Sequence, residues 1–312
     1  MSSSESARTR AADWPDLPLA GWRDTAATLH MWTQIVGKTR LALAPRQNHW
    51  WHTTLYVTER GLTTSAMHGG DRMLSVEFDF IAHALNLRTG DGDSHTLALV
   101  PQTVTDFHAR YLAALRSLDI VPAIMGRPVE VATAIPFADD VQHAAYDAAA
   151  VRRWWQVLAR IDGVFKRFRG DFAGKQSPVH FFWGSFDLAV TRFSGRRAPL
   201  HPGGAPNCPD YVMHEAYSHE CSSAGFWPGG GYVDEPAFYA YAYPEPTGYA
   251  QHAIAPAAAY YHPTAHEFIL PYEAVRHAAD PEADLLAFLR SSYDAAATLG
   301  HWDREALAPY VA

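Results

Sequence analysis

The stretch of residues 177–196 constrains the fold more than any other part of this sequence, because it is dense in aromatic and β-branched residues. That composition is typical of β-strands. If residues 186–193 form one strand, successive side chains alternate between its two faces, and Asp187 lies on the face opposite Arg192. His180, Asp187 and Arg192 are then polar residues among side chains that should be buried. A buried polar group without a partner costs several kcal/mol, so each of the three needs another side chain, a ligand or a metal.

The rest of the chain alternates between strand-like and helix-like segments that turn residues separate. Alternating or β-rich patterns predict further strands at residues 48–57, 62–65, 74–80, 96–100, 129–137, 237–243 and 267–270. Apolar residues at the 3.6-residue period predict helices at residues 22–36, 103–119, 147–169 and 280–299. We therefore predict an α+β fold, in which antiparallel sheet built from hairpins is packed by about four helices.

The chain is expected to form one folded unit behind a short tail. Residues 1–12 are polar and predict a disordered tail, which leaves residues 13–312 as a single α+β domain. Within this domain, strands followed by a helix occur twice, at about 48–119 and 178–299. The sequence Leu-Val-Pro before one helix is similar to Ile-Leu-Pro before the other. This pattern permits two related halves.

Charge and composition argue against two classes of protein. The 312-residue chain has a net charge of −8, whereas a nucleic-acid-binding protein presents a clustered basic surface. No run approaches the roughly 20 apolar residues of a membrane span. A disulfide could join Cys208 and Cys221, but no secretory signal supports an oxidising compartment. We therefore expect a cytoplasmic protein whose partner is a small molecule.

Long motifs along the chain resemble those of one family. The motifs are Asn-His-Trp-Trp-His at residues 48–52, the stretch at 177–196, and the segments at 218–220, 223–229, 238–246 and 268–271. Together they resemble DUF5996, a family of bacterial proteins of unknown function, over nearly the whole chain. The resemblance implies one continuous unit rather than two exchangeable domains. It supplies no activity, cofactor or catalytic residue.

Histidines and acids in residues 211–223 suggest a metal site. His214 and His219 resemble the paired histidines of zinc proteases, but they are five residues apart, which on a helix separates them by about 140°. One ion cannot use both on a straight helix. We interpret the segment as irregular, with His219 and Glu220 meeting His180 from the predicted strand. Two histidines and one carboxylate suit a mononuclear iron or zinc site with open positions.

This metal site leads to a first functional hypothesis, an iron- or zinc-dependent enzyme, such as an oxidoreductase that acts on a small aromatic or apolar substrate. His49 or His52 would add a fourth ligand or a proton shuttle. Both cannot do so, because residues three apart on a strand face opposite sides. Arg192 would bind the substrate, and Asp187 is a further catalytic candidate. The alternative for these residues is a structural role in ordinary hydrogen bonds.

A second hypothesis needs no metal and no catalysis. The protein would bind a small aromatic or apolar ligand in a pocket. The walls of that pocket would be five aromatic side chains, Trp183, Phe226, Trp227, Tyr239 and Tyr241. A haem protein with His180 or His219 as the axial ligand is a third hypothesis. Motifs of esterases and of dinucleotide-binding folds are not found in the sequence.

Overall fold

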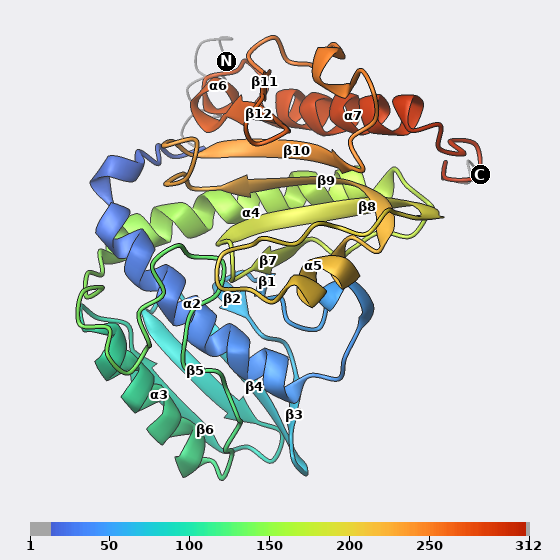
Figure 1. Cartoon of the computed structure of the whole chain (residues 1–312). Coiled ribbons are helices and arrows are strands. Elements are labelled where there is room, and N and C mark those ends of the chain that lie inside the picture. The colour runs from blue at the N-terminus through green and yellow to red at the C-terminus, as the bar shows by residue number, and fades with distance from the viewer. Residues whose placement is uncertain (1–13, 310–312) are drawn as a thin grey trace.

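The computed structural model describes residues 14–309, so the tail predicted at residues 1–12 lies outside the described residues. The described part of the chain forms two antiparallel sheets of six strands each, with helices packed on them (Figure 1). The prediction of an α+β fold is therefore confirmed. Six α-helices lie within these residues, where the periodicity predicted about four. Two of them, α5 (Asp210–Ala216) and α6 (Tyr272–Arg276), are too short to show a helical period.

The first sheet is formed by the N-terminal half of the chain. Its strands follow the order β1-β2-β4-β5-β6, with β3 paired to β4. They are β1 (Tyr56–Val57), β2 (Gly61–Thr63), β3 (Met67–Gly69), β4 (Arg72–Asp79), β5 (Ala84–Thr89) and β6 (Ser94–Ala98). On β4, Leu74, Val76 and Phe78 are buried and alternate with less buried residues, so one face of this sheet packs on the core.

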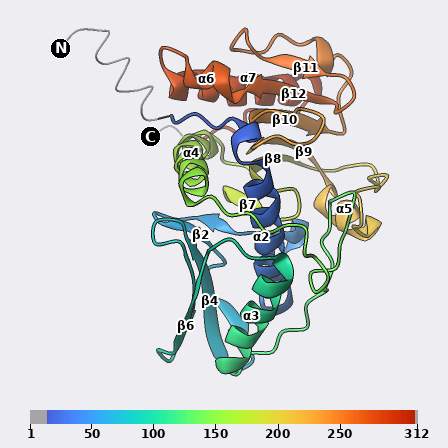
Figure 2. The same ribbon diagram turned by 90° about the vertical axis from the view of Figure 1, so that its left-hand side faces the viewer.

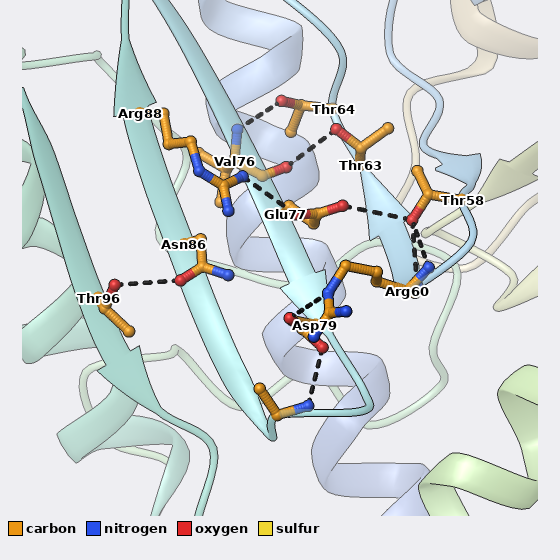
Figure 3. A network of polar contacts seen from close by, with 12 residues as sticks. Thr58, Arg60, Thr63, Thr64, Val76, Glu77, Asp79, Asn86, Arg88 and Thr96 are labelled. Atoms are coloured by element: carbon orange, nitrogen blue, oxygen red, sulfur yellow. Dashed lines mark hydrogen bonds and ion pairs between the residues drawn. The ribbon is translucent and has the colours of Figure 1, made fainter. Parts of the chain in front are cut away.

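The other face of the first sheet carries a polar network (Figure 3). Arg88 forms an ion pair with Glu77 at 3.0 Å, and Thr96 donates a hydrogen bond to Asn86. Antiparallel sheets commonly leave one face in water. Exposed pairs of this kind contribute about 1 kcal/mol or less each. This face is therefore a solvated surface, and the candidate site lies on the second sheet.

The second sheet contains most of the aromatic stretch at residues 177–196. Its strands follow the order β11-β12-β10-β9-β8-β7. They are β7 (His180–Phe182), β8 (Asp187–Arg197), β9 (His219–Trp227), β10 (Ala237–Tyr243), β11 (Tyr260–His262) and β12 (Glu267–Pro271). The two sheets meet at their edges, where the backbones of Leu55 and Phe181 exchange hydrogen bonds of 2.9 and 2.7 Å. Residues 48–119 and 178–299 thus contribute one sheet each, and their common origin stays a prediction.

Helices pack against both sheets. The longer ones are α2 (Arg23–Leu43), α3 (Val104–Ser117), α4 (Ala148–Gly170) and α7 (Pro281–Leu299), and short 3-10 turns are η1 (Leu19–Gly21), η2 (Asn48–Trp50) and η3 (Tyr249–Gln251). Figure 2 shows α2 and α3 on the same side of the first sheet. On the second sheet, α4 runs behind the strands and α5 lies in front (Figure 1). None of the helices within residues 14–309 is long and apolar enough to cross a membrane.

Helix α2 continues past Gly37, where the sequence predicted its end. The glycine meets a packing requirement instead, because a Cβ at this position would lie 2.2 Å from the ring of Trp183. Its absence lets the helix approach that ring while the helical hydrogen bonds continue to Leu43. A glycine that permits close packing and a glycine that ends a helix look the same in a sequence.

Two of the predicted strands differ from the structure. Residues 48–57 contain η2, in which His49 and Trp50 have φ values of 55° and 60°, and only the last two residues of that range form strand. Residues 129–137 form an irregular segment. The physical reason is that β-propensity reports burial on a pleated surface more than a backbone preference, so aromatic and β-branched residues outside a sheet produce the same pattern.

Candidate functional site

A cavity of about 570 Å³ lies on the face of the second sheet that is turned away from α4 and α7. Strands β8, β9 and β10 provide its floor. Residues of η2, α5 and the C-terminal part of α2 lie over it and form what we call the roof. The volume falls in the range of sites for small organic molecules, about 300–1,000 Å³.

The cavity follows from the sizes of the side chains on this sheet face. Strand alternation directs one set of residues toward the cavity and the next toward the helices. Small residues occupy the middle of the cavity-facing set on β8 and β9, namely Ala189, Thr191, Cys221 and Ser223. Larger rings border this hollow, namely Trp183, Trp227, Tyr239 and Tyr241. These four are among the five aromatic residues that the sequence suggested as walls.

Tyr239 crosses the floor from β10 to reach Asp187 on β8, two strands away. Its hydroxyl donates a hydrogen bond to the Asp187 carboxylate. The ring passes over Gly225 on the intervening strand β9, where a Cβ would lie 2.3 Å from the ring. The pairing of Tyr239 with Asp187 therefore requires glycine at position 225.

Substituting Gly225 by alanine is expected to displace Tyr239 and to lower the free energy of unfolding by about 1–3 kcal/mol, the usual cost of overpacking a buried site. Urea denaturation at pH 7 measures this loss. Gly163→Ala on α4 is the matched control, because nothing lies within 4 Å of its added Cβ, and alanine favours a helix. A Gly225→Ala protein as stable as the wild type would contradict the required close approach.

Two carboxyl groups at one end of the cavity are partnered by tyrosine hydroxyls. Asp187 is 6% exposed, and burial raises its pKa to about 7. Burial likewise raises the pKa of Glu267 to about 7, and its carboxylate accepts a hydrogen bond from Tyr232. Burial also raises the pKa of Tyr239, which keeps its hydroxyl a hydrogen-bond donor at neutral pH. Both carboxyls are thus poised near neutral pH, as groups that transfer protons must be.

His49 holds the roof in place with both of its ring nitrogens. Its Nδ1 lies 2.9 Å from the carbonyl oxygen of Ala216 at the end of α5, and its Nε2 lies 2.6 Å from Nζ of Lys175. A carbonyl only accepts and an ammonium only donates, so the ring is the neutral tautomer with its hydrogen on Nδ1. Burial lowers the pKa of His49, in agreement with a neutral ring. Neither nitrogen has a lone pair free for a metal.

The four predicted metal ligands do not converge. The rings of His49 and His219 are close, with centroids 5.6 Å apart. His180 is fully buried outside the cavity lining, and burial lowers its pKa to about 3. Glu220 follows His219 on β9 and therefore points to the opposite face, where it pairs with Arg196. Within residues 14–309, no group of three His, Cys, Asp or Glu side chains is arranged to hold a metal ion.

Three further predicted site residues lie away from the cavity. Arg192 and Phe226 occupy the alternate positions of β8 and β9 and point to the opposite face. There, Arg192 packs on the ring of Phe168 in α4 and Phe226 on that of Tyr272 in α6. His52 lies outside the lining, where its Nδ1 accepts a hydrogen bond from the backbone N–H of Gln47 at 3.2 Å. This geometry does not support Arg192 as a substrate clamp, Phe226 as a pocket wall, or His52 as a proton shuttle.

Sequence reasoning missed three charged residues that line the cavity, Lys38, Glu130 and Glu267. Lys38 follows Gly37, at which the sequence predicts a helix end, and Glu130 lies in the segment 129–137, for which the sequence predicts a strand. Of the three, only Glu267 could have been identified from the sequence, because a carboxylate at the start of an otherwise apolar strand is unusual.

Comparison with known proteins places the chain in a family. The profile described as a family of unknown function (DUF5996) matches residues 14–309. Searches of curated proteins and of solved structures find no significant match. The matched range contains both sheets and every residue that lines the cavity. This chain therefore belongs to the family of unknown function DUF5996.

Proposed function

We propose that this protein binds a small aromatic molecule in the cavity of the second sheet. The observation that carries the proposal is the hollow itself, because small residues occupy the middle of a sheet face that lies beneath a roof. Protein interiors are normally packed without such space. The bordering rings of Trp183, Trp227, Tyr239 and Tyr241 are suited to an aromatic ligand, since each ring pair adds about 0.5–1.5 kcal/mol beyond the area that it buries.

Acid–base catalysis on the bound molecule is the second candidate function. It is favoured by Asp187, a buried carboxyl at the cavity whose pKa is raised to about 7 and whose partner Tyr239 remains a donor. Such a group can hold or release a proton at neutral pH. An iron or zinc centre does not fit the ligand geometry of the described residues, so the proposal uses only the side chains of this chain.

Filling the cavity tests the proposal. Ala189 is 2% exposed on the cavity floor, and Ala189→Phe would place a ring in the hollow. N-Phenyl-1-naphthylamine, an uncharged aromatic probe, is expected to fluoresce when it binds the wild type and to quench the tryptophans at the cavity. We expect Ala189→Phe to weaken this binding at least tenfold, as measured by fluorescence titration.

The control for this experiment is Ala82→Phe, which adds the same side chain at an exposed position in a turn of the first sheet. It is expected to leave the affinity for the probe within twofold of the wild type. Absence of probe binding to the wild type, or equal binding to Ala189→Phe and the wild type, would overturn the proposal.

A further inference from the structure

Lys38 is a buried amine that faces the cavity without a hydrogen-bond partner. Its side chain is 2% exposed on α2 and belongs to the cavity lining. Within the described residues, no acceptor lies within hydrogen-bond distance of its Nζ. The amine lies over the ring of Trp183, whose centroid is 5.3 Å from Nζ.

The packing of α2 accounts for the position of this amine. Gly37 lets the helix approach Trp183, and the next residue of the helix then reaches the cavity beside that ring. The indole nitrogen of Trp183 donates a hydrogen bond of 2.6 Å to the carbonyl oxygen of Thr53, which fixes the plane of the ring. The amine is therefore held by rigid elements rather than by a mobile loop.

The thiol of Cys208 and the carboxylate of Glu130 both act on Lys38 through space, but neither is a hydrogen-bond partner of its amine. Glu130 lines the same cavity, but its carboxylate accepts a hydrogen bond from the Ser185 hydroxyl and forms no ion pair with Lys38. Burial lowers the pKa of Lys38 to about 8, which still leaves most of these side chains charged at pH 7. A buried ammonium without hydrogen bonds is costly, because it has lost water and gained no acceptor.

We infer that the molecule bound in the cavity is an aromatic compound with an oxyanion group, such as a carboxylate, that accepts hydrogen bonds from Lys38. The inference rests on the proposed function and deepens it by naming the class of ligand. Charge-assisted hydrogen bonds of this kind are stronger than neutral ones, so the oxyanion contributes to affinity as well as orientation. Burial raises the pKa values of Asp187, Glu267 and Glu130, which lowers the negative charge near Lys38 and favours an anionic group there.

Two probes that differ only in the oxyanion test this inference. 1-Anilinonaphthalene-8-sulfonate carries a sulfonate that N-phenyl-1-naphthylamine lacks, and both are titrated by fluorescence into the full chain at pH 7. The expected result is that Lys38→Met lowers the affinity for the sulfonate probe at least tenfold and leaves that for the uncharged probe within threefold. Glu130→Gln, which removes a neighbouring acid and keeps Lys38, is expected to bind the sulfonate probe at least as tightly as the wild type.

The possible failures are distinguishable. If the wild type binds neither probe, the proposed function itself is contradicted. If the uncharged probe binds and Lys38→Met leaves the ratio of the two affinities unchanged, only the oxyanion contact is overturned. Lys38→Gln, which keeps a polar side chain without the charge, takes the place of Lys38→Met if circular dichroism shows that the methionine variant does not fold.

Discussion

The asparagine variant of Asp187 is expected to lose a pH dependence that the wild type shows. In the wild type, the free energy of unfolding should fall by up to about 4 kcal/mol between about pH 4 and pH 7, and Asp187→Asn should remove this fall. Burial raises the pKa of Asp187 from 3.8 to about 7. Between these two values the folded protein keeps a proton that the unfolded chain has lost. Stability therefore decreases as pH rises through this window and levels off above it. Each unit of difference between the folded and unfolded pKa values corresponds to about 1.4 kcal/mol.

Urea denaturation of the wild type and of Asp187→Asn from pH 4 to pH 8 measures this effect as the difference between two curves. Glu267→Gln is the comparison variant, because burial raises the pKa of Glu267 to about 7 at the same end of the cavity. Its effect should be smaller, since Glu267 is less buried than Asp187. Parallel curves for the wild type and Asp187→Asn would show that Asp187 titrates as an exposed carboxyl does, and would remove the support for acid–base catalysis.

Truncating Arg192 to alanine is expected to lower the free energy of unfolding by about 3 kcal/mol or more without weakening probe binding. The guanidinium lies over three rings, with its Cζ 3.5 Å from the centroid of Phe168, 4.9 Å from Phe172 and 4.5 Å from Tyr293. It also donates a hydrogen bond to the backbone carbonyl of Phe168. Alanine would remove these contacts and open a void among the rings, while the Phe168 carbonyl keeps the hydrogen bond from the backbone N–H of Asp171.

Arg192→Met is the matched control for this prediction. Methionine fills a similar volume without a charge, and apolar replacement of a buried charged group is often nearly neutral. We expect it to cost about 1 kcal/mol or less in urea denaturation, with the affinity for N-phenyl-1-naphthylamine unchanged. Loss of probe binding by a stable Arg192→Met protein would contradict this prediction and support Arg192 as a residue that binds the substrate.

Much of the second sheet could be predicted from the sequence, because strand alternation is a local property. The pattern around residues 186–193 placed Asp187 and Arg192 on opposite faces, and the structure shows them there. The same rule separates His219 from Glu220 once that segment is known to be strand. The predicted metal site failed at this point, because the surrounding prolines and glycines favoured an irregular segment.

The residues of the candidate site were harder to predict, since they come together only through tertiary contacts. Tyr239 reaches Asp187 across a third strand, and Gly225 makes that crossing possible. Lys38 enters from a helix that is about 150 residues earlier in the sequence, past a glycine that reads as a helix end. No local sequence pattern indicates that residues so far apart in the chain lie close together in the fold.

By itself, the sequence determined the fold class and the two faces of the long strands, because propensity and alternation act between neighbouring residues. Its long motifs also indicated the family. Only the tertiary structure decided which face became a core and which became a cavity. That choice depends on what packs against the sheet: α4 and α7 fill one side with large side chains, whereas the roof leaves a hollow over the small residues of the other. Burial in that hollow then raises the pKa of Asp187 and lowers that of Lys38, and neither shift can be predicted from the sequence around the residue.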